Sequence, residues 1–366
     1  MSPEKKMIPV YEPYLKGKEL EYASDAIRSG WVSSIGEYIK KFEKDFSGYC
    51  GVKDGASCSN GTTALHLALK AFGVKEGDEV IVPNVTFIAT ANAVRYCNAK
   101  PVFVDIDESW CIDPEKIREK ITKKTRGIIP VHLYGMPADM DPIRELAGKH
   151  SLFVLEDCAE AHGARYRGKR VGSLGDASVF SFYGNKVITT GEGGMVLSGN
   201  KELIEEVKVL RDHGMNPKKR YWHDKIGYNY RMTNVQAAIG VAQLENIGKI
   251  LSLKKKLVET YDSILRGNPK ISLQPEIVGR EKVCWIYTAL INANSGKRDS
   301  VIEKLGEKSV DSRPFFYPIN ELPPHRTRET FPKSKDISSR GISLPSSPSL
   351  TRGEIKEVCE KLEELV

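Results

Sequence analysis

Short apolar segments alternate with helical patterns along the first two-thirds of the chain. Six segments are typical of β-strands, namely Glu79–Val82, Pro101–Val104, Gly127–His132, Leu152–Leu155, Ser178–Phe182 and Gly194–Leu197. Helical spacing of apolar residues appears between them, as at Thr63–Phe72. Several of these strands are apolar on both sides of the pleat, as strands of a buried parallel sheet are. The alternation predicts an α/β fold with a large, mostly parallel sheet and helices on both faces.

The pattern changes after about residue 240, where a second domain is expected. The elements predicted there are a long charged helix from Val235 to about Leu265, a strand at Cys284–Ile291, a helix at Asp299–Leu305, an extended Pro- and Ser-rich loop at Leu322–Leu350 and a final helix at Arg352–Leu365. We therefore expect a large domain over residues 1–245. A smaller C-terminal α+β domain would cover residues 246–366, joined to the first by the long helix.

Composition and charge exclude several classes of protein. The chain of 366 residues is 40% hydrophobic and 28% charged, which is an ordinary globular mixture. Its net charge of +7 is spread in short clusters without a nucleic-acid-binding module, so we expect solvated surfaces or contact with a small anion rather than nucleic acid. The seven cysteines lack the spacing of a metal site, so no metal is predicted. Neither a membrane-spanning segment nor a secretory signal is recognisable, so we predict a cytoplasmic protein without membrane contact.

The candidate chemistry centres on one lysine between two apolar strands. Lys186 follows Ser178–Phe182 and precedes the glycine-rich run Gly191–Gly194. A lysine held on such a loop is partly desolvated, which favours its neutral, nucleophilic form. Neutral lysine forms Schiff bases with carbonyl compounds and with pyridoxal phosphate (PLP). A surface lysine in a glycine-rich hairpin gives the same local pattern, so the interpretation depends on companion motifs.

Three companions supply what a PLP site needs. Asp157 ends the strand Leu152–Leu155 at the sheet edge where open α/β folds bind ligands, and its carboxylate could keep the pyridine nitrogen protonated or could cap a helix. The segment Ser59–Leu69 begins a helix whose free N–H groups suit a phosphate, although plain N-capping gives the same pattern. Phe87 could stack on a flat ring or belong to the core. No GxGxxG dinucleotide motif occurs in the chain.

Together these motifs resemble the sugar-nucleotide aminotransferases of the DegT/DnrJ type. The segments that carry the resemblance follow one another along essentially the whole chain: GTTALHLAL (61–69), EDCAEAHGA (156–164), SFYGNK with TTGEGG (181–194), GYNYRMTNVQAAIGVAQLE (227–245) and DSRPFFYP (311–318). The resemblance implies a fold-type I PLP enzyme, with a large seven-stranded-type sheet domain and a smaller C-terminal domain. It also implies pyridoxal 5'-phosphate as the cofactor.

The resemblance assigns the residues around the cofactor ring. Lys186 and Asp157 would be the catalytic residues. Lys186 would hold the cofactor covalently and move the protons, whereas Asp157 would pair with the ring nitrogen. Glu160 would lie near the phenolic oxygen of the ring, and Phe87 would occupy the stacking position.

The resemblance also assigns the residues around the cofactor phosphate. Thr62, Thr63 and Ser181 would bind the phosphate within one chain. Asn229 would reach the phosphate of the neighbouring subunit. The active unit would therefore be a homodimer with shared active sites.

The substrate is expected from the same resemblance. Lys186 stands where a related dehydratase has histidine, which favours transamination. The segments at 181–196, 215–222 and 227–234 look most like the branch that aminates C4 of GDP-4-keto-6-deoxymannose to GDP-perosamine, with L-glutamate as donor, for O-antigen or another surface polysaccharide. The alternatives are the same chemistry on another keto substrate (a 3-keto nucleotide sugar, a cyclitol or a keto-octulosonate) and a non-catalytic regulatory relative. The pair of Lys186 and Asp157 argues against the last of these.

Overall fold

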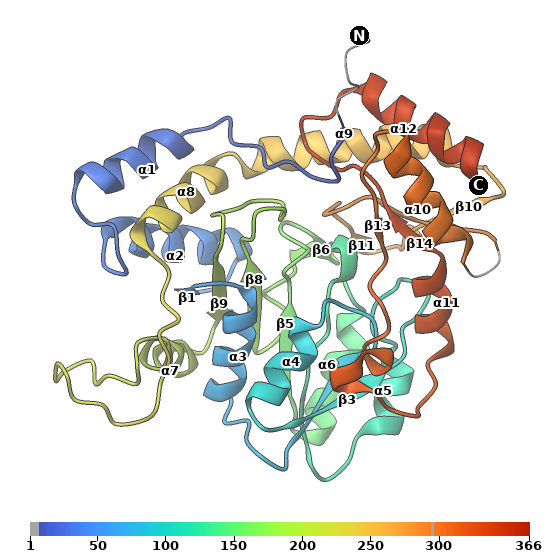
Figure 1. Ribbon diagram of the computed structural model, residues 1–366. Helices are drawn as coiled ribbons and strands as arrows, with labels where there is room; N and C mark the ends of the chain where they lie inside the picture. The colour runs from blue at the N-terminus through green and yellow to red at the C-terminus, as the bar shows by residue number, and fades with distance from the viewer. Residues whose placement is uncertain (1–6, 294–295) are drawn as a thin grey trace.

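A seven-stranded sheet is the largest element of the computed structural model, which describes residues 7–293 and 296–366 (Figure 1). Its strands lie in the order β1 (Asp54–Cys58), β9 (Gly194–Ser198), β8 (Ala177–Ser181), β5 (Phe153–Asp157), β4 (Thr125–Ile128), β2 (Glu79–Pro83) and β3 (Lys100–Val104). Only β9 runs antiparallel to its neighbours among these strands. The prediction of an α/β fold with a large, mostly parallel sheet is confirmed.

Helices cover both faces of this sheet. The helices of this part of the chain are α1 (Glu19–Arg28), α2 (Glu37–Cys50), α3 (Gly61–Ala71), α4 (Ala89–Tyr96), α5 (Pro114–Lys120), α6 (Met140–His150), α7 (Lys201–Arg211) and α8 (Asn234–Glu245), with a 3-10 turn η1 (Leu133–Gly135), and α1 packs on α8. Both faces of the sheet are apolar and need to be covered. Strand β8 is an example, because its successive side chains point to opposite faces. Val179 belongs to the core cluster that contains Leu67 of α3 and Val207 of α7. Phe180 packs against Phe46 of α2 on the other face, with ring centroids 4.9 Å apart.

A smaller α+β unit follows α8. Its antiparallel sheet has the order β10 (Ile271–Leu273), β12 (Thr288–Ile291), β14 (Gly341–Ser343) and β13 (Arg313–Pro314). Its helices are α9 (Ile247–Leu265), α10 (Lys297–Glu307), the 3-10 turns η2 (Ile319–Glu321) and η3 (Pro323–His325), α11 (Pro332–Arg340) and α12 (Arg352–Leu365). A separate small sheet pairs β11 (Arg280–Glu281) of this region with β6 (Arg165–Tyr166), which also pairs with β7 (Lys169–Arg170).

Two local predictions in this region are wrong. The expected single helix from Val235 to Leu265 is two helices, because Asn246 adopts φ −99° and ψ 0° and separates α8 from α9. The Pro- and Ser-rich segment Leu322–Leu350 is not a continuous loop, since it contains α11 and β14. Pro332 occupies the first turn of α11, a position at which the missing N–H of proline costs nothing.

The first described residues pack on the smaller unit. Ile8 pairs with Val310 in an isolated bridge, and the N–H of Val10 donates to Asp311 at 3.2 Å. The division of the chain into residues 1–245 and 246–366 stays a prediction. In the part of the chain that the structure describes, no helix is both long enough and apolar enough to cross a membrane.

Candidate active site

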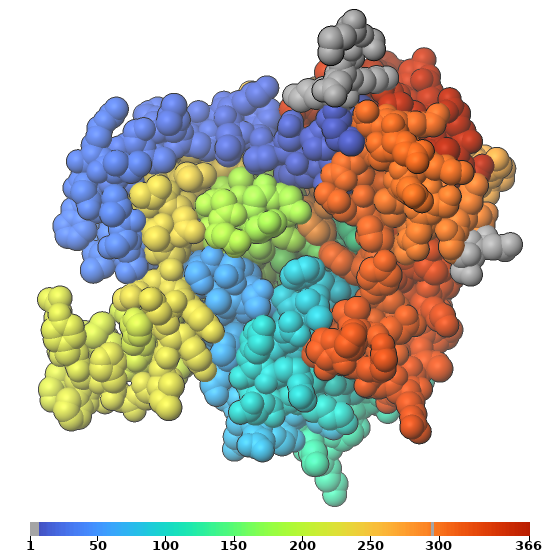
Figure 2. Space-filling model, in the orientation of Figure 1, coloured from blue at the N-terminus to red at the C-terminus, as the bar shows by residue number. Residues whose placement is uncertain are grey.

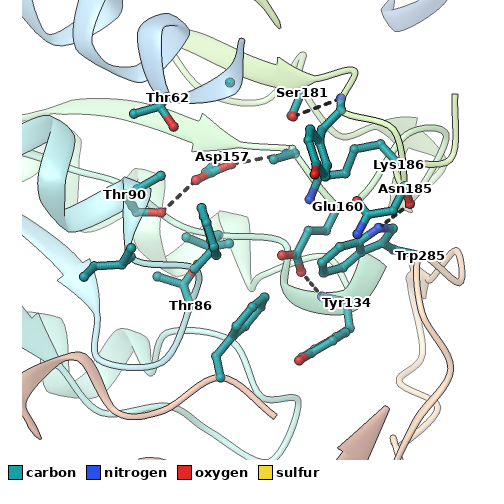
Figure 3. Close-up of a pocket in the computed structure, with 18 of the residues that line it drawn as sticks. Thr62, Thr86, Thr90, Tyr134, Asp157, Glu160, Ser181, Asn185, Lys186 and Trp285 are labelled. Atoms are coloured by element: carbon teal, nitrogen blue, oxygen red, sulfur yellow. Dashed lines mark hydrogen bonds between the residues drawn. The ribbon is translucent and has the colours of Figure 1, made fainter. Parts of the chain in front are cut away.

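A cavity of about 740 Å³ lies at the carboxyl edge of the large sheet and is closed on one side by the smaller unit (Figure 3). Six of the eight predicted site residues line it: Thr62, Phe87, Asp157, Glu160, Ser181 and Lys186. The other two, Thr63 and Asn229, are described by the structure but do not line this cavity. The fold therefore gathers residues that are spread over more than 120 positions of the chain.

The Lys186 loop is closed at both ends by paired strands. Ser181 at the end of β8 is paired with Gly194 at the start of β9, so the intervening loop leaves and re-enters the sheet at one place. The N–H of Lys186 donates to the carbonyl of Tyr183 at 2.9 Å, and its carbonyl accepts from the Tyr11 hydroxyl at 2.9 Å. These bonds fix the main chain on both sides of the lysine.

The Lys186 amine lies among an aromatic ring and two carboxylates. Its Nζ is 3.7 Å from the ring centroid of Trp285. Burial lowers the pKa of Lys186, and the negative charges of Glu160 and Asp157 oppose that shift. The partly desolvated, more nucleophilic lysine expected from the sequence is what this geometry provides.

Asp157 ends β5 inside the cavity with both carboxylate oxygens bonded. Oδ2 accepts from the Thr90 hydroxyl at 2.9 Å, and Oδ1 accepts from the Ala159 N–H at 3.2 Å. Burial raises the pKa of Asp157, while these bonds and the charge of Lys186 favour the anion. Among the described elements the next after β5 is strand β6, so the alternative that Asp157 caps a helix is wrong.

Glu160 lies beside Lys186 and is buried. Its Oε2 accepts from the main-chain N–H of Tyr134 at 2.7 Å, and Tyr134 itself adopts a left-handed conformation with φ 51°. Burial raises the pKa of Glu160, and Lys186 together with the Tyr134 N–H opposes the shift. The site thus holds two carboxylates around one amine.

Aromatic rings form the wall opposite the sheet. Tyr134 stacks on Trp285 and on Phe316, with centroid distances of 5.7 and 5.4 Å. Phe87 reaches this wall from the other side, at 6.0 Å from Phe316, and its side chain is 56% exposed. The alternative that Phe87 belongs to the core is therefore wrong.

The start of α3 forms the third part of the site. A Cβ on Gly61 would lie 2.8 Å from the Cβ of Ser181, so the helix start and the end of β8 are in direct contact. Within residues 7–293 and 296–366 the N–H groups of Gly61 and Thr62 have no acceptor. Thr63 is engaged instead in a capping box, in which its hydroxyl accepts from the Asn60 N–H at 3.1 Å and donates to the Asn60 carbonyl at 2.8 Å.

Asn229 lies outside this cavity, on the exposed surface. Its side-chain oxygen accepts from Arg231 at 2.9 Å, and its backbone forms a bridge with Asp212. It stands at the base of the loop between α7 and α8, which projects from the body of the molecule (Figures 1 and 2).

Sequence reasoning missed several residues of the site. The one sequence feature that could have indicated Thr90 is its place in the first turn of α4. This helix follows strand β2, which ends at the same edge of the sheet as β5. Trp285 has no local signal, because it comes from the smaller unit and meets Asn185 and Lys186 about 100 positions away. Tyr134 is likewise placed by tertiary packing, in a left-handed turn between β4 and α6.

Comparison with known proteins agrees with this geometry. Residues 13–363 match the model of the DegT/DnrJ/EryC1/StrS aminotransferase family. The chain belongs to this family. It is 46% identical to the GDP-perosamine synthase of Vibrio cholerae, over 96% of this chain and 97% of that one, and 46% identical to the GDP-perosamine synthase of Caulobacter vibrioides, over 98% of each. A candidate sugar aminotransferase from Streptococcus pneumoniae, solved in its PLP-form, matches with a TM-score of 0.93 and 27% identity over 98% of this chain and 100% of that one.

The family settles the reaction class. This member of the DegT/DnrJ/EryC1/StrS family is a PLP-dependent sugar aminotransferase, so the predicted enzyme class and cofactor are confirmed. The residues present fit that cofactor. An amine, a buried carboxylate and two N–H groups without acceptors meet in one cavity of suitable size.

Proposed function

We propose that this aminotransferase converts GDP-4-keto-6-deoxymannose to GDP-perosamine with L-glutamate as amino donor. The observation that carries the substrate is the 46% identity, over nearly the whole chain, to two proteins named for that reaction. The observation that supports the chemistry is the meeting of Lys186, Asp157 and the open start of α3 in one cavity. We propose further that the reaction takes place in the cytoplasm and supplies O-antigen or another surface polysaccharide.

The cofactor phosphate would be bound by the start of α3. The free N–H groups of Gly61 and Thr62 and the positive end of the helix dipole suit a phosphate, and the Ser181 hydroxyl lies beside them. The hydroxyl of Thr62 faces the same space (Figure 3). Thr63 would act through the capping box that holds this first turn, and its direct contact with the phosphate stays a prediction.

The ring of the cofactor would lie between Phe87 and the sheet edge. The Asp157 carboxylate would pair with the ring nitrogen and keep it protonated, and Glu160 would lie near the phenolic oxygen. When bound, PLP supplies an electron sink for the carbon that bears the transferred amino group. These assignments come from the family resemblance, and they are supported by the fact that Phe87, Asp157 and Glu160 all line the cavity.

Lys186 would carry the protons of the reaction. Burial lowers the pKa of its amine and so favours the neutral form, which could accept the α proton of glutamate and return it to the cofactor carbon that is joined to the amino nitrogen. The stacked rings of Tyr134, Trp285 and Phe316 form an apolar wall beside this amine. Glutamate leaves as 2-oxoglutarate before the keto sugar is aminated by the same steps in reverse, which gives ping-pong kinetics.

We also propose a homodimer with shared active sites. Asn229 does not line its own cavity, so a role at the phosphate requires a neighbouring subunit. The projecting loop next to it carries apolar side chains that one chain leaves exposed, with Tyr221 at 77% and Ile226 at 90%. Exposed apolar groups of this kind are typical of an interface.

The experiment is a substrate panel. The PLP-loaded enzyme is incubated with L-glutamate and a series of 4-keto and 3-keto nucleotide sugars, and the products are identified by mass and NMR. We expect amination at C4 of GDP-4-keto-6-deoxymannose, and no product from Lys186→Ala with any sugar. Amination at C3, or turnover restricted to another sugar, would contradict the proposed substrate. Absence of turnover with every sugar would favour the regulatory alternative.

A further inference from the structure

A second lysine, Lys254 of α9, is almost completely buried. Its side chain is 1% exposed, and its Nζ donates to the carbonyl oxygens of Trp285 at 2.7 Å and Ser346 at 2.6 Å. The same ammonium lies 5.0 Å from the ring centroid of Tyr11. Burial lowers the pKa of Lys254 to about 8, which leaves it mainly charged at neutral pH. Burying an ammonium is costly unless its protons are bonded, so its position needs a reason.

Two partners of Lys254 also contact Lys186. The Trp285 ring lies 3.7 Å from the Lys186 Nζ, and the indole N–H donates to the carbonyl of Asn185 at 2.8 Å (Figure 3). The Tyr11 hydroxyl donates to the Lys186 carbonyl at 2.9 Å. Lys254 therefore contacts both Trp285, whose ring lies beside the Lys186 amine, and Tyr11, whose hydroxyl bonds the Lys186 carbonyl.

The same face of α9 holds the main chain around these residues. Tyr261 lies two turns after Lys254, on the same side of the helix, and its hydroxyl donates to the carbonyl of Pro345 at 2.9 Å. The N–H of Ser346 donates to the carbonyl of Val10 at 2.8 Å. Through Lys254 and Tyr261, α9 thus holds residues 345 and 346, and Ser346 in turn bonds the N-terminal segment that carries Tyr11. Lys254 also holds the segment that carries Trp285.

We propose that Lys254 is a positioning residue that orients the Lys186 amine through Trp285 and Tyr11. The inference rests on the proposed role of Lys186 as the reacting lysine. A displacement of about 1 Å at a reacting group can cost about 100-fold in rate, so a small shift of the Trp285 ring would be felt at Lys186. Lys254 itself does not line the cavity formed by the described residues around Lys186, so it acts only through its partners.

The test compares Lys254→Met, Trp285→Phe and the double variant, with Lys255→Met as the exposed matched control. Three quantities are measured on the PLP-loaded enzymes: kcat and KM for the amination, and the pH midpoint of the visible absorbance, which reports protonation at the Lys186 nitrogen. We expect Lys254→Met to lower kcat about 10-fold or more, to leave KM within about threefold and to shift the midpoint. Lys255→Met should match the parent. In the Trp285→Phe background, Lys254→Met should lower kcat by a smaller factor than in the parent, because the indole through which part of its effect acts is already replaced.

Three outcomes would overturn the inference. The first is a parent-like absorbance midpoint and kcat in folded Lys254→Met. The second is multiplication of the two effects in the double variant, which indicates independent structural roles. If Lys254→Met does not fold, Lys254→Gln, which keeps one donor to a carbonyl, takes its place with the same expectations. The third is borohydride labelling of a lysine other than Lys186, which would also contradict the proposed role of Lys186. A label on Lys186 together with an unchanged absorbance midpoint in Lys254→Met would overturn this inference alone.

Discussion

The hydroxyl of Thr90 donates a 2.9 Å hydrogen bond to Oδ2 of Asp157, so a residue of α4 sets the orientation of the carboxylate that ends β5. The other oxygen accepts from the Ala159 N–H. Both donors are neutral and favour the anion, although burial raises the pKa of Asp157. The two bonds present the carboxylate to the cavity in a fixed direction and favour its charged form.

Replacing Asp157 by asparagine should separate charge from shape. The amide oxygen can still accept from Thr90, so we expect the variant to fold and bind PLP. Without the negative charge the ring nitrogen loses its protonating partner, and the single-turnover rate should fall by a factor on the order of 100 or more. A rate within about twofold of the parent, less than roughly 0.5 kcal/mol of barrier, would contradict the role of Asp157. Thr90→Val tests its orientation and should give a smaller loss.

Lys186→Ala should abolish transamination while leaving the fold intact. Reduction of the PLP-loaded parent with borohydride should attach the cofactor to the peptide that contains Lys186, because this amine faces the cavity beside Glu160. Peptide mapping by mass spectrometry identifies the labelled residue. Lys254→Met is the control for the other buried lysine and should keep the label. A label elsewhere would refute the assignment.

Gly61→Ala should damage the cofactor cradle. The added Cβ would lie 2.8 Å from the Cβ and 3.2 Å from the Oγ of Ser181, which forces the start of α3 and the end of β8 apart. We expect a loss of about 1–3 kcal/mol in unfolding free energy and weaker PLP binding, measured by denaturation and by titration. The control is Gly48→Ala in α2, where the added Cβ meets open space and should be neutral or slightly stabilising. Equal behaviour of the two variants would argue against a tight cradle.

His162 should make the fold sensitive to acid. It is buried among Phe46, Phe180 and Phe182, and neither ring nitrogen has a partner among the described residues. Burial lowers the pKa of His162 from 6.5 to about 3, so between these values the unfolded chain binds one proton more than the folded chain. Stability from this residue is therefore fully present above pH 6.5 and is lost as the pH falls.

His162→Leu should reduce that acid sensitivity. The slope of unfolding free energy against pH, measured by denaturation between pH 4.5 and 6, should fall by about 1.4 kcal/mol per pH unit. His150→Leu, at the exposed end of α6, is the matched control and should keep the parent slope. An unchanged slope in His162→Leu would show that the histidine is bonded or solvated in the folded protein.

A shared active site should allow two inactive variants to rescue one another. Mixing Lys186→Ala with Asn229→Ala puts both lesions into one pocket of a hybrid dimer and leaves the other pocket intact, so activity should partly return after subunit exchange. Asn229→Ala must first be shown to be folded and inactive. If exchange is confirmed by native mass spectrometry and no activity returns, Asn229 acts within its own chain, as its bond to Arg231 allows.

The sequence predicts the parts of the site that stand at the ends of strands. Lys186 and Asp157 could be placed because short, mainly apolar segments mark β5 and β8, and parallel strands end at a common edge. The start of α3 could be placed because Asn60 and Thr63 are good capping residues. The same capping pattern could not show that the Thr63 hydroxyl is turned back to Asn60, since the choice between cap and ligand depends on the rotamer.

Other features could not be predicted because they depend on packing between distant segments. Trp285 belongs to the smaller unit, and nothing in its neighbours indicates that its ring meets Lys186. The break at Asn246 interrupts a pattern that is helical on both sides, so periodicity alone continues through it. Helix α11 begins within a segment whose Pro and Ser content is typical of loops, and its burial against the rest of the unit decides its structure.

The bridge between Ile8 and Val310 has a consequence for how the protein is made. Ribosomes add residues one at a time, at about 5–20 per second, and early segments emerge long before late ones. Tyr11 precedes Lys186 and Trp285 follows it, so the two contacts with Lys186 cannot both form until most of the polypeptide has been synthesised. A nascent chain can pair β8 with β9 and still lack the wall of the cavity. Cofactor capture is therefore expected to follow translation, and a ribosome-stalled chain that ends before residue 285 should not acquire the visible absorbance of bound PLP.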